Sequence, residues 1–399
     1  MIKSVIKKLL PKFFLSWYYQ FFPALGALIY GFPSKKLTVI GITGTNGKSS
    51  VVELLTSVFQ QAGIDVCSIS SIRFQIKDEI VQNKLKMTMP GRMHIHKFLR
   101  KAVNQGCKYA VIEVTSEGIK QFRHKFIDFK TAVLTNLTQE HIEAHGSFEN
   151  YKKAKGELFK NAEIAIVNLD DKNAEYFLSF KGTKYGFTLK DEKRDFKVVG
   201  PEDIGFNLKL KGEFNISNAL AVACVGISEE ISIENIRAGL EKVELISGRL
   251  EKVIDKPFSV YVDYAHTPDA LVNIYKTLSG NSRLVCVLGS CGGGRDKWKR
   301  PELGKIAAQY CDKIILTNED PYDEVPEKIL KDIEVAIIGH QDYQLIIDRK
   351  EAIKKALQSA HPGDVVIISG KGREPWMCVA NHKKIPWDDR KIVEQELKL

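Results

Sequence analysis

Residues 37–49, with the sequence LTVIGITGTNGKS, decide the fold because they join an apolar run to a glycine-rich loop. Residues 37–43 have the composition of a buried strand, and apolar residues with helical spacing follow directly between residues 51 and 58. A strand, a glycine loop and a helix N-terminus in this order form an anion cradle, since backbone N–H groups and the helix dipole face the anion. The stretch therefore predicts an α/β domain with a phosphate site at residues 44–49.

Two side chains of this loop have specific tasks in a nucleotide site. Lys48 would reach the β- and γ-phosphates, and Ser49 would bind Mg²⁺. The loop is shorter than the full GxxxxGK[ST] spacing, because Ile42 stands where the first glycine would be. Taken alone, GTNGKS is also compatible with a structural glycine turn, and the strand and helix around it favour the nucleotide site.

After Lys36 the chain alternates short apolar runs with amphipathic stretches, which is typical of parallel strands joined by crossover helices. We expect strands at residues 37–43, 109–115, 131–136, 162–168, 259–262, 284–289, 313–317 and 364–369. Most of them end in polar or glycine residues, and ligands in open α/β sheets bind at the carboxyl ends of strands. Glu113 lies near the end of one of these strands, where its carboxylate could hold a metal or a water bound to it, and a salt bridge is the alternative. Asn136 and His141 lie at the end of another strand, and this shared location favours a functional role over packing or surface exposure.

Between residues 172 and 211 the sequence is more polar. There we expect two short antiparallel strands, at 184–188 and 205–210, followed by a helix at 215–225. A break at Ile246–Gly248 predicts a boundary between a central domain, 37–245, and a C-terminal domain, 246–399.

The composition, 44% apolar and 27% charged, is that of an ordinary globular protein. The net charge of +10 comes from lysines spread along the whole chain, and the sequence has no nucleic-acid-binding motif, so we expect no nucleic-acid partner. No two of the seven cysteines have CxxC spacing, so we interpret them as reduced, mostly buried thiols of a cytoplasmic protein.

The first 36 residues differ from the rest. Residues 13–34 carry no charge, are rich in aromatic residues and are flanked by lysines, while Gln20 and Pro23 interrupt the apolar run. Three interpretations stay open: a helix pair that docks on a membrane surface, packing against the next domain, and a single membrane span. We expect peripheral contact with the inner face of the membrane through residues 1–36.

Nine motifs occur in the order seen in Mur ligases, and from about residue 36 to residue 399 the chain resembles this family. The motifs are GTNGKS at 44–49, EVTS at 113–116, TNLTQEH at 135–141, YKKAK at 151–155, FNISNA at 214–219, SGR at 247–249, DYAHTPD at 263–269, GGGRDKWKRP at 292–301 and GKGRE at 370–374. The resemblance is to the UDP-N-acetylmuramoyl-tripeptide synthetase branch, which adds the third peptide residue of the peptidoglycan precursor. It implies a P-loop ATPase domain with a mostly parallel sheet, followed by a Rossmann-like α/β domain.

The resemblance also implies roles for single residues in an ATP-dependent ligase that works through an acyl phosphate. The implied catalytic residues are Lys48, Glu113, His141 and Lys155, and Ser49, Glu113, His141 and Lys155 would hold Mg²⁺, with Lys155 as a carbamate. The implied nucleotide contacts are Gly44, Thr45, Asn46, Gly47, Lys48, Ser49, Ser50, Asn215, Asn218, Arg249, Asp263 and His266. Thr88, Ser116, Gln121 and Arg123 match positions for the muramoyl-peptide acceptor, and Arg295, Asp320, Tyr322, Gly370 and Glu374 match positions for the incoming amino acid.

Two departures from the family pattern limit what the resemblance implies. Residues 1–36 stand where the branch has a full UDP-binding domain, so the acceptor is either UDP-linked or carried by another group such as a lipid. Tyr322 replaces the arginine that pairs with the distal carboxylate of diaminopimelate, and Arg373 stands where relatives have histidine, so lysine, ornithine or another amino acid is also open. We expect a monomer. The alternatives are a folylpolyglutamate- or cyanophycin-synthetase-like ligase and a non-catalytic ATP-binding subunit of a cell-wall complex.

Overall fold

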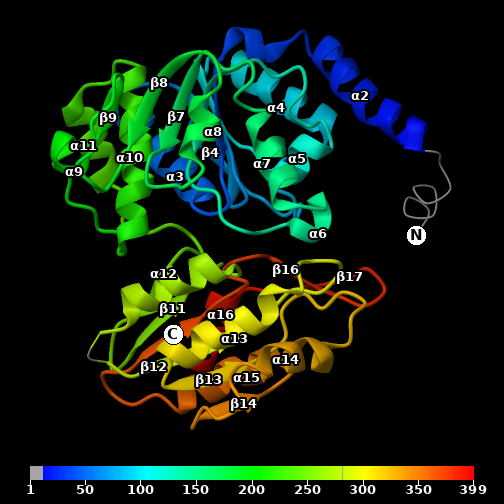
Figure 1. Cartoon of the computed structure of the whole chain (residues 1–399), viewed down its shortest axis with the longest axis vertical. Helices are drawn as coiled ribbons and strands as arrows, with labels where there is room; N and C mark the ends of the chain where they lie inside the picture. The colour runs from blue at the N-terminus through cyan, green and yellow to red at the C-terminus, as the bar shows by residue number, and fades with distance from the viewer. Residues whose placement is uncertain (1–11, 281) are drawn as a thin grey trace. The chain divides into compact units, whose positions relative to one another are not determined.

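The computed structural model describes residues 12–280 and 282–399, which form two compact units (Figure 1). The first unit contains the chain up to Leu137, Glu149–Asn207 and Ile216–Lys242, and the second contains Thr138–Phe148, Leu208–Asn215 and Val243–Leu399. The chain passes finally into the second unit at Val243. The boundary at 246 stays a prediction of the domain organisation.

The first unit is built on a large sheet that is mostly parallel. Within the described residues this sheet has nine strands in the order β4-β3-β2-β5-β1-β6-β7-β8-β9, and β3 pairs antiparallel with both of its neighbours, β2 and β4. The strands are β1 (Thr38–Thr43), β2 (Val66–Ile69), β3 (Arg73–Ile76), β4 (Glu79–Gln82), β5 (Tyr109–Glu113), β6 (Phe129–Leu134), β7 (Ile164–Asn168), β8 (Thr183–Phe187) and β9 (Lys197–Val199). Strand β1 is central, and its apolar side chains are fully buried because helices cover both faces.

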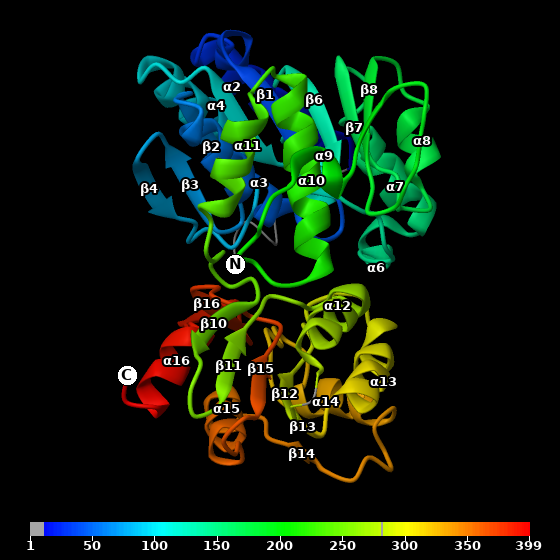
Figure 2. The ribbon, with the colours of Figure 1, turned by 90° about the vertical axis from the view of Figure 1, so that its left-hand side faces the viewer.

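Helices α3, α10 and α11 cover one face of this sheet, and α4, α5 and α7 cover the other (Figures 1 and 2). The helices outside the C-terminal part of the chain are α2 (Lys12–Ile29), α3 (Lys48–Gln61), α4 (Arg92–Asn104), α5 (Ser116–Lys120), α6 (Ile142–His145), α7 (Phe148–Gly156), α8 (Ala174–Leu178), α9 (Pro201–Ile204), α10 (Glu213–Ser228) and α11 (Ile233–Glu241), with a 3₁₀ helix η1 (Pro33–Lys36). Helix α3 contains the predicted helical residues 51–58 and starts at Lys48, inside the predicted loop.

The second unit has its own sheet, which the described residues form in the order β10-β11-β15-β12-β13-β14, with only β10 antiparallel. Alternate side chains of these strands feed two cores, one under α12, α13 and α14 and one under α15 and α16. Its elements are β10 (Glu251–Ile254), β11 (Ser259–Val262), α12 (Pro268–Leu278), β12 (Leu284–Leu288), α13 (Lys299–Tyr310), β13 (Lys313–Leu316), α14 (Pro326–Glu334), β14 (Tyr343–Leu345), α15 (Arg349–Gln358), β15 (Val365–Ile368), the hairpin β16 (Trp376–Val379) and β17 (Lys383–Pro386), and α16 (Asp389–Glu396). The expected fold class is confirmed.

All the strands predicted from apolar runs are present, and two predictions in the polar stretch are wrong. The strand predicted at 184–188 exists as β8, but it pairs parallel with β7 and β9, because α8 returns the chain to the same end of the sheet. Residues 205–210 form no strand. Gly205 adopts a left-handed conformation that ends α9, and the alternation of half-buried residues after it lies in an irregular connection.

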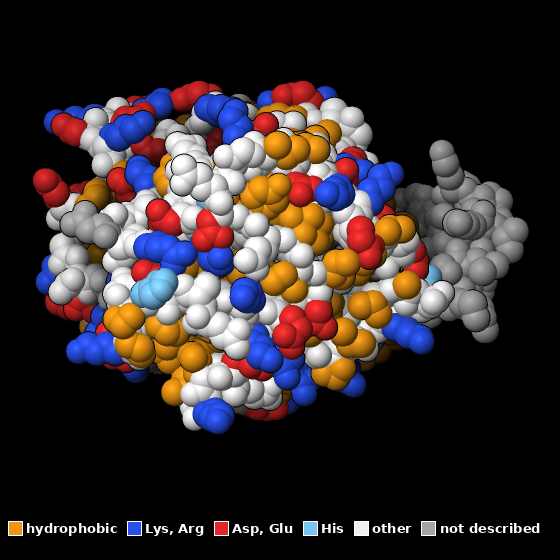
Figure 3. Space-filling model, turned by 90° about the horizontal axis from the view of Figure 1, so that it is seen from below, with side chains coloured by type: hydrophobic (Ala, Val, Ile, Leu, Met, Phe, Trp, Pro, Cys, Tyr) orange, Lys and Arg blue, Asp and Glu red, His pale blue; other side chains and the backbone are white. Residues whose placement is uncertain are grey.

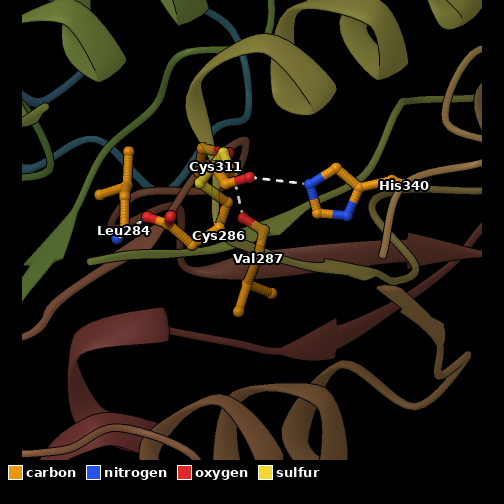
Figure 4. Close-up of a disulfide and its surroundings, with 7 residues drawn as sticks. Leu284, Cys286, Val287, Cys311 and His340 are labelled. Atoms are coloured by element: carbon orange, nitrogen blue, oxygen red, sulfur yellow. Dashed lines mark hydrogen bonds between the residues drawn. A yellow bond between two sulfur atoms is a disulfide. The ribbon is translucent and has the colours of Figure 1, made fainter. Parts of the chain in front are cut away.

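The interpretation of all cysteines as reduced thiols is wrong for two of them. Cys286 on β12 and Cys311, the residue that follows α13, form a disulfide (Figure 4). Their Cα atoms are 6.0 Å apart, because the turn between α13 and β13 lies beside β12, where the backbone N–H of Asp312 donates to the backbone oxygen of Leu284. The two cysteines are 25 residues apart in the sequence, without CxxC spacing. The backbone oxygen of Cys311 also contacts Nε2 of His340 at 2.9 Å.

The described part of the N-terminal segment packs on α4. Gly26 of α2 lies against Met93 and His96, and Nε of Arg100 donates to the backbone oxygen of Tyr30 at 2.7 Å. Among the described residues, none of the helices combines the length and the apolar character that crossing a bilayer requires. Residues 1–11, which belong to the segment predicted to contact a membrane, lie outside the described residues.

The charges are dispersed, as the sequence predicts. On the face that Figure 3 shows, Lys and Arg side chains are interspersed with Asp and Glu side chains. This mixture is typical of a solvated surface.

Two buried histidines should make the stability of the first unit depend on pH. Burial lowers the pKa of His96 and of His124 to about 4, so the unfolded chain binds more protons than the folded chain between pH 6.5 and 4. Stability should therefore fall as pH drops through this range, by about 1–3 kcal/mol for each histidine. The urea concentration at the midpoint of unfolding, measured between pH 7.5 and 5, reports this loss of stability. The double variant His96→Gln/His124→Gln should show a flatter profile, and a slope equal to that of the unchanged protein would contradict the account.

Candidate functional site

The loop between β1 and α3 has a backbone that only glycine tolerates at two positions. Gly44 has φ 151° and Gly47, which caps α3, has φ 82°. A Cβ atom on Gly44 would lie 1.9 Å from Oγ1 of Thr135, and one on Gly47 would lie 2.3 Å from Oδ1 of Asn218. Glycine at these positions therefore allows the turn itself and lets Thr135 and Asn218 pack directly against the loop backbone.

Gly47→Ala should weaken ATP binding through Asn218, which it would displace. The left-handed φ alone should cost about 1–2 kcal/mol of stability. Gly63→Ala is the matched control, because Gly63 has φ 71° and open space around its Cβ direction. We expect both variants to lose stability, and only Gly47→Ala to lose ATP affinity, by about tenfold. Equal ATP affinities in the two variants, measured by calorimetry, would count against this role of the loop.

The end of β6 supports the loop from one side. The backbone N–H of Asn46 donates to Oδ1 of Asn136 at 2.9 Å, and Oγ1 of Thr135 donates to the backbone oxygen of Asn46 at 2.6 Å. Lys48 folds over the loop, and its Nζ donates to the backbone oxygens of Gly44 at 3.0 Å and Thr45 at 2.7 Å. The ammonium group thus lies above the cradle where the phosphates would be.

Ser49 and Glu113 are brought together at the carboxyl ends of β1 and β5. Oγ of Ser49 donates to Oε2 of Glu113 at 2.9 Å, and both side chains are buried. The backbone N–H of Ser71 donates to the same carboxylate oxygen at 2.8 Å, a contact that the sequence does not predict. A hydroxyl and a carboxylate beside a phosphate loop are the donors that Mg²⁺ uses, so these residues fit that ion.

No group of three or more His, Cys, Asp or Glu residues suited to a metal ion occurs in the described part of the chain. In ATP-using enzymes Mg²⁺ is usually bound by one or two carboxylates together with substrate phosphates and water.

Lys155 of α7 reaches the same loop from the other side. Its side chain is fully buried, and Nζ donates to the backbone oxygen of Gly44 at 2.6 Å and lies 4.7 Å from the ring centre of Tyr151. Burial, followed by the nearby Lys48 ammonium, lowers the pKa of Lys155 well below its usual value. This amine is therefore neutral far more readily than a surface lysine.

Two of the predicted nucleotide contacts, Asn215 and Asn218, lie at the start of α10. Asn218, in the first unit, lies against the loop at Gly47. Asn215, in the second unit, donates through Nδ2 to the backbone oxygen of Lys211 at 2.7 Å. Ser50 is buried in the first turn of α3.

The predicted contacts Arg249, Asp263 and His266 belong to the second unit. The guanidinium of Arg249 lies 4.5 Å from the ring centre of Tyr264, and Asp263 accepts from the backbone N–H groups of Leu250 and Ala265. Burial, followed by the nearby Lys299 ammonium, lowers the pKa of His266 well below its usual value. These contacts fix the loops around β11 in one conformation.

Two of the residues predicted to bind the incoming amino acid, Asp320 and Glu374, contact a buried lysine that the sequence did not single out. Nζ of Lys371 donates to Oδ1 of Asp320 at 2.9 Å and to Oε2 of Glu374 at 2.6 Å. A Cβ atom on Gly370 would lie 2.4 Å from Oε2 of Glu319, which is also buried. Lys371 belongs to the motif GKGRE at 370–374, but the sequence does not show that this lysine is buried.

Tyr322 lies beside a second glycine turn. A Cβ atom on Gly293 would lie 2.5 Å from Cδ2 of Tyr322, so this loop requires glycine where the tyrosine ring packs. Arg295 follows in the same loop, and its NH1 contacts Nδ1 of His141 at 3.4 Å. His141 thus belongs to the second unit, together with the residues predicted to bind the incoming amino acid.

Three of the predicted acceptor residues lie around α5. NH2 of Arg123 donates to Oε1 of Gln121 at 2.8 Å, and Ser116 is buried in the first turn of the helix. Arg92, which the sequence did not indicate, donates through Nε to the backbone oxygen of Gln121 at 2.9 Å. Burial, followed by the charge of Arg92, lowers the pKa of Arg123. Two guanidinium groups side by side favour an anionic ligand. Thr88 lies half-buried in the segment before α4.

Comparison with known proteins gives matches along most of the chain. Residues 42–226 match the Mur ligase middle domain, and residues 248–372 match the Mur ligase glutamate ligase domain. Two UDP-N-acetylmuramoyl-L-alanyl-D-glutamate–2,6-diaminopimelate ligases, from Syntrophomonas wolfei and Clostridium acetobutylicum, are 36% and 37% identical to it, over 94% of this chain and 81% of theirs.

Solved structures agree with these matches. A UDP-N-acetylmuramoyl-L-alanyl-D-glutamate–2,6-diaminopimelate ligase superposes with a TM-score of 0.60 at 28% identity, covering 91% of this chain and 78% of the other. A Mycobacterium tuberculosis folylpolyglutamate synthase complexed with ADP and AMPPCP superposes with a TM-score of 0.68 at 18% identity, covering 88% and 92%, which shows a shared fold. The family matches and the relatives together show that the chain belongs to the Mur ligase family.

Proposed function

We propose that this chain is an ATP-dependent acid–amino-acid ligase that extends a muramoyl-peptide in peptidoglycan synthesis. The observation that carries the proposal is the convergence of Lys48, the Ser49–Glu113 pair and the buried amine of Lys155 on one glycine loop. Relatives of known name act on UDP-N-acetylmuramoyl-L-alanyl-D-glutamate and 2,6-diaminopimelate. A peptide carboxylate of such an acceptor is the substrate that we assign to this site.

The reaction proceeds in two steps. A carboxylate oxygen of the acceptor attacks the γ-phosphorus of ATP, ADP leaves, and an acyl phosphate forms. The amine of the incoming amino acid then attacks the acyl carbon, inorganic phosphate leaves, and the nitrogen loses a proton. Negative charge develops in both steps, and the Lys48 ammonium and the loop N–H groups stabilise it.

Bound Mg²⁺ would add positive charge beside the β- and γ-phosphates, held by Ser49 and Glu113. We propose that Lys155 contributes as a carbamate. Its neutral amine would attack CO₂, an N–C bond would form and the nitrogen would lose a proton, so that a buried neutral group would become an anion. We also propose His141 as a ligand, as the family resemblance implies.

The incoming amino acid would bind around Arg295, Asp320, Tyr322, Gly370 and Glu374. Tyr322 offers a phenol where a diaminopimelate-binding arginine would offer a guanidinium, so we propose that a distal carboxylate is not the main determinant of selection. A screen of diaminopimelate, lysine and ornithine against UDP- and lipid-linked acceptor would identify both substrates.

We propose that the chain works as a monomer at the inner face of the membrane. The exposed apolar side chains Phe21, Leu28, Ile29 and Phe32, followed by Lys35 and Lys36, favour contact with an anionic lipid surface. Flotation tests this by measuring how much protein is recovered with anionic vesicles and how much with neutral vesicles. Equal recovery in both, or none in either, would argue against it.

ADP release that requires both acceptor and amino acid tests the proposed function. A non-catalytic ATP-binding subunit would release no ADP under any of these conditions. A folylpolyglutamate-type ligase would respond to a folate acceptor in place of the muramoyl-peptide. The assay therefore separates the proposal from both rivals.

A further inference from the structure

The segment Thr138–Phe148 carries His141 and the one-turn helix α6. By its packing it belongs to the second unit, although the chain on either side of it, at Leu137 and Glu149, belongs to the first. Every residue of α6 is at least partly exposed. A single turn of helix does not form unaided, since nucleation is unfavourable, so contacts from elsewhere must impose its conformation.

Asp296 supplies the first of these contacts. Its carboxylate accepts from the backbone N–H of Ile142 at 3.1 Å and from that of Glu143 at 2.8 Å. These are the first-turn amides of α6, which have no partner within a helix. Asp296, which is itself buried, thus performs from a distant part of the sequence the task of an N-cap side chain.

A buried ion pair holds the other side of His141. Nζ of Lys299 lies 2.9 Å from Oε1 of Glu140, and the two side chains are only 2% and 4% exposed. In addition, the carboxylate of Glu143 accepts from the backbone N–H of Lys297 at 2.8 Å. The GGGRDKWK loop therefore contacts the segment immediately before and immediately after His141, which itself adopts a left-handed conformation with φ 58°.

We infer that Asp296 and Lys299 are positioning residues that hold the segment around His141. Arg295, a predicted amino-acid contact, lies in the same loop, 3.4 Å from His141. The same loop thus carries Arg295, a predicted contact of the incoming amino acid, and positions His141, a predicted metal ligand. The link to the metal rests on the proposed function, while the positioning itself rests on the contacts alone.

Hydrogen exchange of the backbone amides of residues 138–148 tests the positioning directly. Asp296→Asn should speed exchange at Ile142 and Glu143 by about tenfold or more, because it removes charge-assisted hydrogen bonds. The double variant Glu140→Gln/Lys299→Met removes both charges of the buried pair and should loosen the same segment. Lys297→Met is the control, since its exposed side chain pairs with Glu324 and only its backbone N–H contacts the segment. Unchanged exchange in both test variants would overturn the inference.

A second measurement connects the positioning to the reaction. In Asp296→Asn the Mg²⁺ concentration for half-maximal ADP release should rise about tenfold, with an unchanged melting temperature, as expected for an outer partner of a metal ligand. Wild-type Mg²⁺ dependence together with faster exchange would overturn the link to the metal. Absence of ADP release from the unaltered protein would instead reject the proposed function, and the exchange result would still stand.

Discussion

Lys48→Ala is expected to lower kcat/KM for ATP by roughly 10²–10³-fold while leaving the fold intact. Nζ of Lys48 donates to two backbone oxygens of the loop, so the loop itself holds the ammonium beside the predicted phosphate site. Its positive charge is needed where the transferred phosphoryl group carries developing negative charge. Alanine removes this charge and adds no bulk.

Phosphate release and ATP affinity should be measured together for this variant. We expect most of the loss in kcat, since a charge that acts on the transition state contributes more there than in binding. Lys77→Ala is a suitable control, because Lys77 forms an exposed ion pair with Asp65 away from the loop. Turnover close to wild type in Lys48→Ala would remove the basis of the proposed function.

The elements around this loop are predictable from sequence because their signals are local. Strand β1 is a continuous apolar run, the loop has its glycines, and the pattern of α3 begins at once. Strand β4 has no such signal, because all its residues are exposed and only pairing with β3 makes it a strand. The direction of β8 is a property of the whole sheet, so its short polar sequence does not reveal it.

The same distinction applies to the site. Motif resemblance indicates Glu113 and Lys155, and the structure brings both to the loop. Ser71 joins Glu113 through its backbone N–H, which no side-chain pattern encodes. The sequence does not distinguish Lys371 from a surface lysine, whereas in the structure it is buried and pairs with two carboxylates. The Cys286–Cys311 disulfide likewise depends on the fold, which places the turn after α13 beside β12.

Removing CO₂ is expected to inactivate the protein, and Lys155→Ala is expected to lower kcat by at least about 100-fold. Burial and the Lys48 ammonium lower the pKa of Lys155, so its amine is neutral and nucleophilic at a pH where other lysines are protonated. Added bicarbonate should restore the activity of the CO₂-depleted protein. Acidification should reverse the modification, because a proton on the amine competes with CO₂.

Lys153→Ala is the matched control, since Lys153 lies on the same helix with its side chain exposed. With ¹³C-bicarbonate, a carbamate signal should be present in the unaltered protein and in Lys153→Ala, and absent in Lys155→Ala. A buried ammonium between Gly44 and Lys48 would be destabilising, whereas a carbamate would attract both Lys48 and Mg²⁺. Full activity without CO₂, or the same carbamate signal in Lys155→Ala, would show that this lysine acts in its unmodified form.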